Sequence, residues 1–305
     1  MVRIVSLLPS ATEILYALDL EAQLVGVTHE CDFPPAAWAK PRLTASALPH
    51  ASSPGEIDRH VRRSVHEGSS LYSLDAPLLE RLAPDLIVTQ ELCAVCAVGY
   101  AIVARAAKRL SSDPRIVSLE PSSLEDVYAN ILTLGDLTGT VPRARSVVDA
   151  LRGRMVALAR RVEGRVRPRT LVLEWTDPPM SGGHWTPGLV EAAGAAPVLA
   201  HPGANSQTLD WSAIAAADPD VVLVAPCGFD LERTLGAVRE LTAREAWNDL
   251  RAVRTGRAFA LDGNAYVNRP GPRLVDSAEL FASAIHGMHE GAAQTDPRAL
   301  AAICA

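Results

Sequence analysis

A Cys-x-x-Cys pair, Cys93 and Cys96, follows the apolar run at residues 84–88 and is the arrangement in this sequence most capable of chemistry. Thiolates at this spacing bind zinc or iron–sulfur clusters, act as a redox couple or form a disulfide. His29 and Cys31 follow an earlier apolar run and could complete a four-ligand metal set. Structural zinc sites usually have two such pairs, so two small buried residues beside a pocket are an equal alternative.

Composition and charge exclude several classes of protein. The chain of 305 residues is long enough for two domains. Its net charge of −6 argues against a nucleic-acid surface, and we interpret the basic cluster at residues 152–169 as a solvated helix face. No apolar run approaches the roughly 20 residues of a membrane helix, so we expect no direct membrane insertion.

The first residues of the sequence do not resemble an export signal. Only five consecutive apolar or small residues precede Pro9, and no cysteine stands where a lipid would be attached. We therefore expect a cytoplasmic protein. In that compartment free, metal-bound or catalytic cysteines are favoured over structural disulfides.

Short β-branched runs alternate with helical patterns in both halves of the chain, which predicts parallel sheets covered on both faces. Strands are expected at residues 3–8, 23–28, 85–90, 115–120, 169–175 and 256–263, with a further apolar strand within residues 212–228. Helices are expected at 10–20, 77–83, 95–110, 272–290, around 187–195 and before Leu250. The pairs Ser10 and Glu13, and Ser122 and Glu125, have the spacing of capping boxes.

The middle of the chain predicts one long helix between two similar halves. Apolar residues from Val141 to Val162 step by three and four, which indicates about six turns of amphipathic helix. Residues 78–90 and 213–226 both place a helix end, a Pro-Asp and an apolar strand in the same order. The predicted fold is therefore α/β, with two similar lobes of mainly parallel sheet joined by a helix. The domains are an N-terminal lobe at 1–121, connecting helices at 122–166, a C-terminal lobe at 167–290 and a tail at 291–305.

Five stretches of the sequence carry a resemblance to a known family. They are "RIVSLLPSATEILYAL", "VGVTHECDFP", "LLERLAPDLIV", "AIAAADPDVVLV" and "RPGPRLVDSAELF". Their order resembles the substrate-binding proteins for cobalamin and iron chelates that serve ABC importers, the helical-backbone metal receptors with a periplasmic-binding-protein-like fold. The resemblance covers most of the chain. It implies two lobes held by a rigid helix, little hinge motion and a ligand clamped between the lobes, and it leaves the ligand's identity open.

The resemblance also identifies positions where this sequence departs from the family. Aromatic residues that line the cleft of cobalamin binders are replaced here by Glu30, Gln90 and Gln207. Trp175, Met180 and Tyr266 could retain part of an apolar wall.

Two further departures concern partners and length. The glutamates that dock importer-bound members on permease arginines correspond here to Pro77 and Ser212, which places docking on an ABC permease in doubt. Residues 46–72 resemble an insertion relative to shorter members of the family.

In parallel sheets, ligands bind beyond the carboxyl ends of the strands. This rule, the resemblance and the Gly-rich turn at residues 180–188 together give the candidate ligand-binding residues. They are Ser10, Thr12, His29, Glu30, Gln90, Trp175, Met180, His184, Trp185, Tyr266 and Arg269. The candidate metal ligands are Cys31, Cys93, Cys96 and His29.

Structural roles are open for several of these residues. The Gly-rich turn could bring backbone N–H groups to an anionic or amide ligand, or could simply return the chain to the sheet. It has neither the P-loop lysine nor the G-x-G-x-x-G spacing, so nucleotide binding has little support. Arg269 could form a salt bridge or contact a ligand. Cys227, after an apolar strand, is most simply a core residue.

Three functions are compatible with the sequence. The first is non-catalytic binding of cobalamin, another corrinoid or a metal chelate, as a carrier, store or sensor in the cell. The second is a cytosolic metalloprotein or thiol enzyme that uses Cys31, Cys93 and Cys96, with zinc or an iron–sulfur cluster as cofactor. The third is an importer component exported from a longer precursor. No nucleophile, base and orienting group can be assembled from spacing, so no reaction is assigned.

Overall fold

The computed structural model describes residues 2–47, 52–67, 71–90, 100–288 and 299–303, and these form two compact units. The first unit contains residues 1–52, 56–120 and 128–148; the second contains residues 53–55, 121–127 and 149–305. Each unit is built on its own sheet. Within the described residues, no helix is both long and apolar enough to cross a membrane.

A sheet of parallel strands forms the centre of the first unit, in the order β2-β1-β5-β6 within the described residues. The strands are β1 (Ile4–Ser6), β2 (Leu24–Val27), β5 (Leu86–Thr89) and β6 (Arg115–Ser118). They lie within the ranges expected from the sequence. The accompanying helices are α1 (Pro9–Ala17), α3 (Ala76–Leu82), α4 (Tyr100–Ala107) and α5 (Leu124–Thr138).

The strands β1 and β5 of this sheet are buried along their whole length. Val5 and Ile87 are fully buried and pack in one cluster with Leu79 of α3 and Val103 of α4. Near-continuous apolar runs of this kind are typical of parallel strands covered by helices.

The segment around the expected insertion contains elements that the sequence did not predict. Strands β3 (Thr44–Ser46) and β4 (Tyr72–Leu74) pair antiparallel, and α2 (Pro54–His66) lies between them in the chain. A 3₁₀ helix, η1 (Pro35–Ala39), precedes them. Three-residue strands are too short to show a periodic pattern, which explains why they were missed.

The sheet of the second unit has the order β12-β11-β10-β7-β8, with β9 paired to the start of β7, among the residues described. The strands β7, β10 and β11 are parallel, and β8 and β12 are antiparallel edges. These strands are β7 (Arg169–Thr176), β8 (Pro179–Ser181), β9 (Ala196–Pro197), β10 (Val221–Val224), β11 (Ala258–Leu261) and β12 (Leu300–Ala302). The predicted tail at 291–305 thus contributes a strand that the sequence did not reveal.

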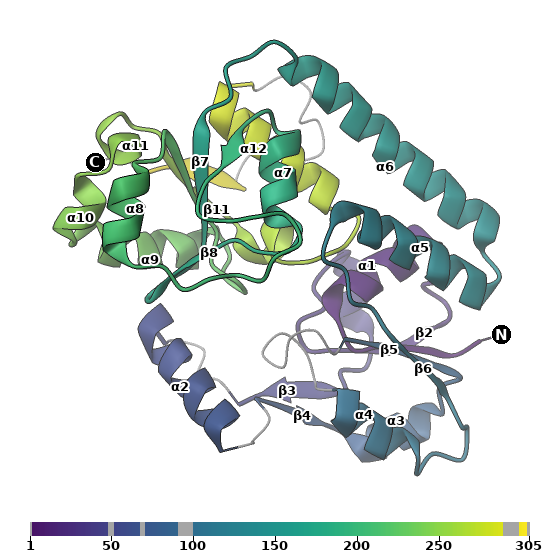
Figure 1. The fold of residues 1–305 in the computed structure, drawn as a ribbon. Helices are drawn as coiled ribbons and strands as arrows, with labels where there is room; N and C mark the ends of the chain where they lie inside the picture. The colour runs from purple at the N-terminus through teal and green to yellow at the C-terminus, as the bar shows by residue number, and fades with distance from the viewer. Residues whose placement is uncertain (1, 48–51, 68–70, 91–99, 289–298, 304–305) are drawn as a thin grey trace. The chain divides into compact units, whose positions relative to one another are not determined.

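Helices cover both faces of this second sheet, with α7 and α12 on one side and α8 to α11 on the other (Figure 1). Trp247 is fully buried and packs in a cluster with Leu171 and Leu173 of β7 and with Val222 and Val224 of β10. The helices are α7 (Thr186–Ala192), α8 (Trp211–Ala217), α9 (Leu231–Thr242), α10 (Glu245–Asn248), α11 (Arg251–Arg254), α12 (Leu274–His286) and the π-helix η2 (Gly263–Val267).

The long helix predicted from the apolar stripe is α6 (Val141–Val162), which begins in the first unit and ends in the second. Ala144 and Leu158 of the stripe are buried. Gly135 of α5 allows a close approach to α6, since a Cβ at this position would lie 2.5 Å from the Cβ of Ala144.

The repeated Pro-Asp has the same structure in both units. Asp85 accepts the backbone N–H of Arg3 at 2.7 Å, at the start of β1. Asp220 accepts the backbone N–H of Arg169 at 2.9 Å, at the start of β7. Each aspartate therefore satisfies a donor at the amino end of the neighbouring strand.

The helix starts differ in detail from the expected capping boxes. α1 begins at Pro9, and its N-cap, Leu8, makes no side-chain cap, so Ser10 lies inside the first turn. At α5 the box is one residue later than expected. Ser123 Oγ accepts the N–H of Asp126 at 3.2 Å, while Asp126 Oδ2 accepts the N–H of Ser122 at 3.0 Å.

Candidate functional site

Two aromatic side chains meet at the carboxyl ends of β7 and β10: Trp175 lies near the end of β7, and Phe229 follows β10. The rings of Trp175 and Phe229 are 5.5 Å apart at 69°, an edge-to-face contact. The indole N–H of Trp175 donates to the carbonyl of Asp177 at 3.1 Å, and the Arg233 guanidinium lies 3.9 Å from the centre of the Phe229 ring. The two rings are thus fixed in orientation at the edge where a ligand would bind.

Met180 extends this apolar surface. It pairs in register with Trp175 across β7 and β8 and is half-buried. Gln207, expected at a former aromatic position, is exposed on the segment that follows, where its backbone carbonyl accepts the N–H of Ser181 at 2.9 Å.

The Gly-rich turn is the segment 182–185 between β8 and α7, and it is paired with the loop 203–207. The N–H of His184 donates to the carbonyl of Ala204 at 2.6 Å. A Cβ on Gly183 would lie 2.3 Å from the backbone nitrogen of Ser206, so only glycine fits. His184 itself has a φ of +52°, a left-handed conformation that few non-glycine residues adopt.

The turn presents two of the predicted ligand-binding residues. The indole N–H of Trp185 donates to the carbonyl of Val267 at 2.8 Å, which fixes the ring against η2. The ring of His184 lies 5.6 Å from that of Trp185. Burial lowers the pKa of His184, and a hydrogen bond with Asn205 opposes the shift, so the neutral imidazole is favoured.

Glu174 connects β7 to the turn. Its Oε2 accepts the N–H of Gly183 at 3.1 Å, and its carboxyl also hydrogen-bonds with Ser206. Burial raises the pKa of Glu174 above the ordinary value, against the two hydrogen bonds, which favour the ionised form.

The π-helix η2 places Tyr266 near the carboxyl end of β11. Asp262 caps η2 by accepting the N–H of Ala265 at 2.7 Å, and burial raises the pKa of Asp262. Arg269 is buried and donates to Asn264 Oδ1 at 2.9 Å, so it braces η2. π-helical turns often occur at functional sites.

In the first unit, a chain of hydrogen bonds links the first strand to the loop after β2. Ser6 Oγ donates to the carbonyl of Leu8 at 2.9 Å, and Thr12 Oγ1 donates to Ser6 Oγ at 2.9 Å. Cys31 Sγ lies 3.0 Å from Thr12 Oγ1. Because the single hydrogen of Thr12 is directed to Ser6, the thiol of Cys31 must be the donor to Thr12.

His29 is held by a second hydroxyl group. Its backbone N–H donates to Thr44 Oγ1 at 3.0 Å, and its Nδ1 lies 2.6 Å from the same oxygen. Thr28 Oγ1 lies 2.7 Å from Thr44 Oγ1, so the two hydroxyls can reverse their donor order. His29 Nε2 lies 3.9 Å from Glu30 Oε1.

The other two predicted residues of the first unit are almost fully enclosed. Ser10, in the first turn of α1, is 3% exposed, and Gln90, directly after β5, is 7% exposed. Both lie at carboxyl ends of strands, as the strand-end rule requires.

The proposed metal set is only partly described. Cys93 and Cys96 lie outside the described residues, as does Cys304. Cys31 is buried and donates to Thr12, whereas Cys227 is exposed after β10. Within the described ranges, no group of three or more His, Cys, Asp or Glu side chains could hold a metal ion.

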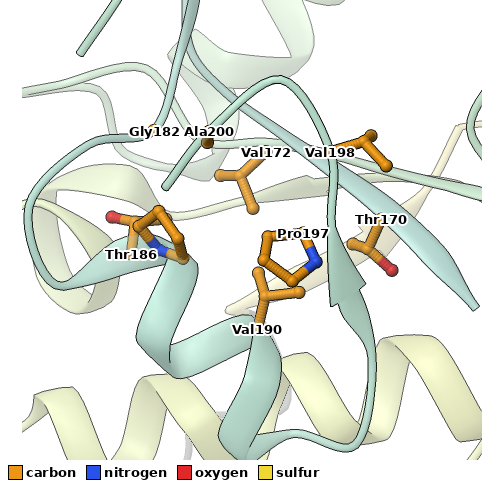
Figure 2. A pocket seen from close by; sticks show the side chains of 9 residues that line it. Thr170, Val172, Gly182, Thr186, Val190, Pro197, Val198 and Ala200 are labelled. Carbon is orange, nitrogen blue, oxygen red and sulfur yellow. The ribbon is translucent and has the colours of Figure 1, made fainter. Parts of the chain in front are cut away.

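A small pocket lies next to the turn and is distinct from the aromatic surface. Val172 of β7, Val190 of α7, and Pro197 and Val198 surround it (Figure 2). Its volume of about 10 Å³ is close to the space that one water requires. It is too small for a chelate.

The permease-docking positions are exposed on short helices. Pro77 lies in the first turn of α3, and Ser212 lies in the first turn of α8. Neither residue carries a charge.

Sequence reasoning missed several residues that shape these edges. Phe229 directly follows the loop after β10, and its position at a strand end was a usable signal. Thr44 and Tyr72 belong to β3 and β4, which gave no signal, although the ring of Tyr72 lies 5.6 Å from that of His29.

Comparison with known proteins finds relatives that match 93% of this chain. A cobalamin-binding protein of Halobacterium salinarum is 25% identical over 288 residues, which cover 93% of this chain and 69% of that protein. An uncharacterized ABC transporter substrate-binding lipoprotein of Bacillus subtilis, YvrC, is 23% identical over 290 residues, 93% of this chain and 80% of the relative.

The fold is also found in a solved structure. The crystal structure of a periplasmic heme binding protein from Pseudomonas aeruginosa superposes with a TM-score of 0.74 at 22% identity, and the match covers 99% of this chain and 98% of that one. The predicted α/β fold with mainly parallel sheets is therefore confirmed. The family model described as "Periplasmic binding protein" matches residues 4–265, from β1 into η2, so the chain belongs to that family.

Proposed function

We propose that the chain binds a metal chelate of the tetrapyrrole class, namely cobalamin, another corrinoid or heme, without converting it chemically. The observation that carries the proposal is the aromatic surface at the carboxyl edge of the second unit. Flat macrocycles bind well against aromatic and aliphatic side chains, with a few polar groups that set their orientation. The relation to a cobalamin-binding protein and the fold shared with a heme-binding protein support this class of ligand.

The second unit supplies the apolar contacts in this proposal. Trp175, Phe229 and Met180 contact the face of the macrocycle, and Trp185 and Tyr266 contact its edge. Hydrogen bonds to Asp177 and Val267 already orient the two indoles, so little side-chain freedom is lost on binding.

The first unit, taken by itself, has polar groups at its own strand ends. Corrinoids carry amide groups around the ring and heme carries carboxylates, and both need hydrogen-bonding partners. His29 and Glu30 are side chains of the kind that such groups require, and Thr12 and Cys31 hold the loop after β2 in place.

The test is a titration of the purified chain with hydroxocobalamin, cyanocobalamin and hemin, followed by absorption spectra and tryptophan fluorescence. We expect saturable binding near one equivalent for at least one of them. Trp175→Leu should weaken that binding by about 10- to 100-fold, the usual cost of an aromatic anchor. Trp38→Leu is the matched control, because Trp38 is 56% exposed on η1, beneath Arg42. Absence of saturable binding by all three ligands would reject the proposal.

We also propose that the chain acts in the cytoplasm without docking on a permease through Pro77 and Ser212. The uncharged first turns of α3 and α8 support the absence of such docking. Cell fractionation of the natural host should recover the protein in the cytosolic fraction. Recovery with the membranes together with a permease would contradict it.

A further inference from the structure

Glu174 connects three segments of the second unit. It is part of β7, it accepts the N–H of Gly183 in the 182–185 turn at 3.1 Å, and it is hydrogen-bonded to Ser206 in the 203–207 loop. The turn and the loop are also joined to each other through the N–H of His184, which donates to the carbonyl of Ala204. The carboxyl of Glu174 is therefore a point of attachment for both segments.

The turn that Glu174 contacts is closely packed against its neighbours. A Cβ on Gly183 would lie 2.6 Å from Ser206 Oγ, and one on Gly182 would lie 2.6 Å from Thr186 Cγ2. The hydrogen bonds of Glu174 to Gly183 and Ser206 form together only while the turn lies against the 203–207 loop. Movement of the turn away from the 203–207 loop would return Glu174 to water.

Closure and protonation of Glu174 are therefore linked. In the closed turn, burial raises the pKa of Glu174, whereas in an open turn the solvated carboxyl has its ordinary pKa. The closed state thus binds a proton more tightly than the open state, so a fall in pH favours closure. Above the raised pKa, the buried charge works against closure.

Other titratable groups lie on the segments that contact Glu174. They are His184 on the turn, His201 just before the 203–207 loop, and Cys227, whose N–H donates to the carbonyl of Glu174 at 3.1 Å. Burial lowers the pKa of His184, so its protonation in acid favours opening, the opposite sign to that of Glu174. A variant of Glu174 alone is needed to separate the two effects.

We propose that Glu174 is a positioning residue that couples closure of the turn bearing His184 and Trp185 to uptake of one proton, so that the chelate binds more tightly when Glu174 is neutral. This inference rests on the proposed function because the turn carries Trp185, one of the proposed ligand contacts. The proton comes from solvent and stays on the carboxyl. The O–H then donates to Ser206 Oγ, and the other oxygen still accepts the N–H of Gly183.

The first experiment uses the full chain without ligand, labelled with ¹⁵N-glycine. The amide shift of Gly183 should titrate with Glu174. The protection of the Gly183 amide against hydrogen exchange, corrected for intrinsic exchange, should rise as the pH falls from about 8 to 5. The rise should be at most about tenfold for each unit by which the pKa of Glu174 in the closed turn exceeds its pKa in the open turn.

Glu174→Gln should give high protection of Gly183 at about pH 8 that no longer rises in acid, because the amide keeps both hydrogen bonds without the charge; a fall in acid in this variant then reports His184. Asp262→Asn is the matched control. It removes the charge of another buried carboxyl at the same sheet edge, whose Oδ1 accepts the N–H of Ala265. The protection of Gly183 should then be unchanged. Two results would overturn the inference. One is equal protection of Gly183 in wild type and in Glu174→Gln at about pH 8. The other is a loss of protection in acid that is still present when His184→Gln is introduced into the wild-type chain.

The second experiment titrates hydroxocobalamin and hemin into the same variants across this pH range. We expect tighter binding by Glu174→Gln than by wild type at about pH 8, with a weaker pH dependence. Equal affinities would overturn the inference while leaving the proposed function in place. If the Gly183 amide responds as expected but no chelate binds, the closure device stands and the proposed function fails.

Discussion

The turn that precedes β5 in the first unit recurs before β10 in the second. α3 ends at Ala83 with a φ of +39°, and α8 ends at Asp218 with a φ of +37°. A Pro-Asp follows in both, and Asp85 and Asp220 each hold the first backbone N–H of the neighbouring strand. The two units are therefore nearly the same at the amino ends of their sheets.

The carboxyl ends of the two sheets differ in chemistry. The first unit has hydroxyl, thiol and imidazole groups that hydrogen-bond to one another, as in the chain from Cys31 through Thr12. The second has the aromatic pair Trp175 and Phe229 beside a Gly-rich turn. The turn before the central strand is thus repeated in both units, whereas the edge available to a ligand differs between them.

The units are expected to differ most in the stability that they gain from salt bridges to α6. In the second unit, Arg154 donates to Asp276 and Glu279, whose side chains are only 12% and 9% exposed. Arg154→Met leaves both carboxylates buried without their partner and should cost about 3 kcal/mol in the free energy of unfolding, measured in urea. The loss should be greater at high pH, because burial raises the pKa of Asp276 and its ionised form is then penalised most.

Arg143→Met tests the corresponding contact in the first unit. Arg143 bridges Asp19 at 2.8 Å, with both side chains well exposed. The loss should be below about 1 kcal/mol, as for other exposed pairs. Equal losses for the two arginines would show that burial does not distinguish them.

The second prediction concerns the polar edge of the first unit. Thr12→Val removes the acceptor of Cys31 and the donor to Ser6 inside a buried chain. Unfolding free energy should fall by about 2 kcal/mol. Thr12→Ser keeps the hydroxyl and should therefore lose much less unfolding free energy. If it were as unstable as Thr12→Val, the loss would come from packing instead.

The third prediction tests the repeated turn. Asp85→Ala and Asp220→Ala each remove an acceptor from one backbone N–H and should cost about 1 kcal/mol. Asp220→Ala should be slightly the worse, because Arg251 Nη1 also donates to Asp220 at 2.8 Å. Thermal unfolding of both variants measures these losses. If either variant were as stable as wild type, the two turns would not be equivalent.

The smallest expected effect is on reactivity and leaves the fold unchanged. Native alkylation with iodoacetamide should label Cys227, which is exposed, well before Cys31, which is buried and hydrogen-bonded. Peptide mapping by mass spectrometry follows each site. Rapid labelling of Cys31 would mean that the first unit opens at this edge.

The sequence predicts the repeated strands and the long helix because their patterns are long or fully apolar. Val141 to Val162 keeps one stripe for six turns, and the strands before Gln90 and Pro226 are continuous apolar runs. Each pattern reflects the burial of the element's own residues, so it can be recognised without knowing the loops around it.

The candidate site was harder to predict because contacts from distant segments determine its geometry. The register of the 182–185 turn depends on the 203–207 loop, and the orientation of Trp185 depends on the carbonyl of Val267. The pairing of Thr44 with His29 depends on β3, a strand of three residues. No local pattern records these contacts.

The short strand β12 has a consequence for how the protein behaves in a crowded solution. It covers the outer edge of β11 and becomes the edge of the sheet itself, with only three residues, Leu300–Ala302. A long open edge would offer backbone groups to strands of other molecules, and a very short one offers too few to template such growth. The last described strand thus protects the second unit against edge-to-edge self-association.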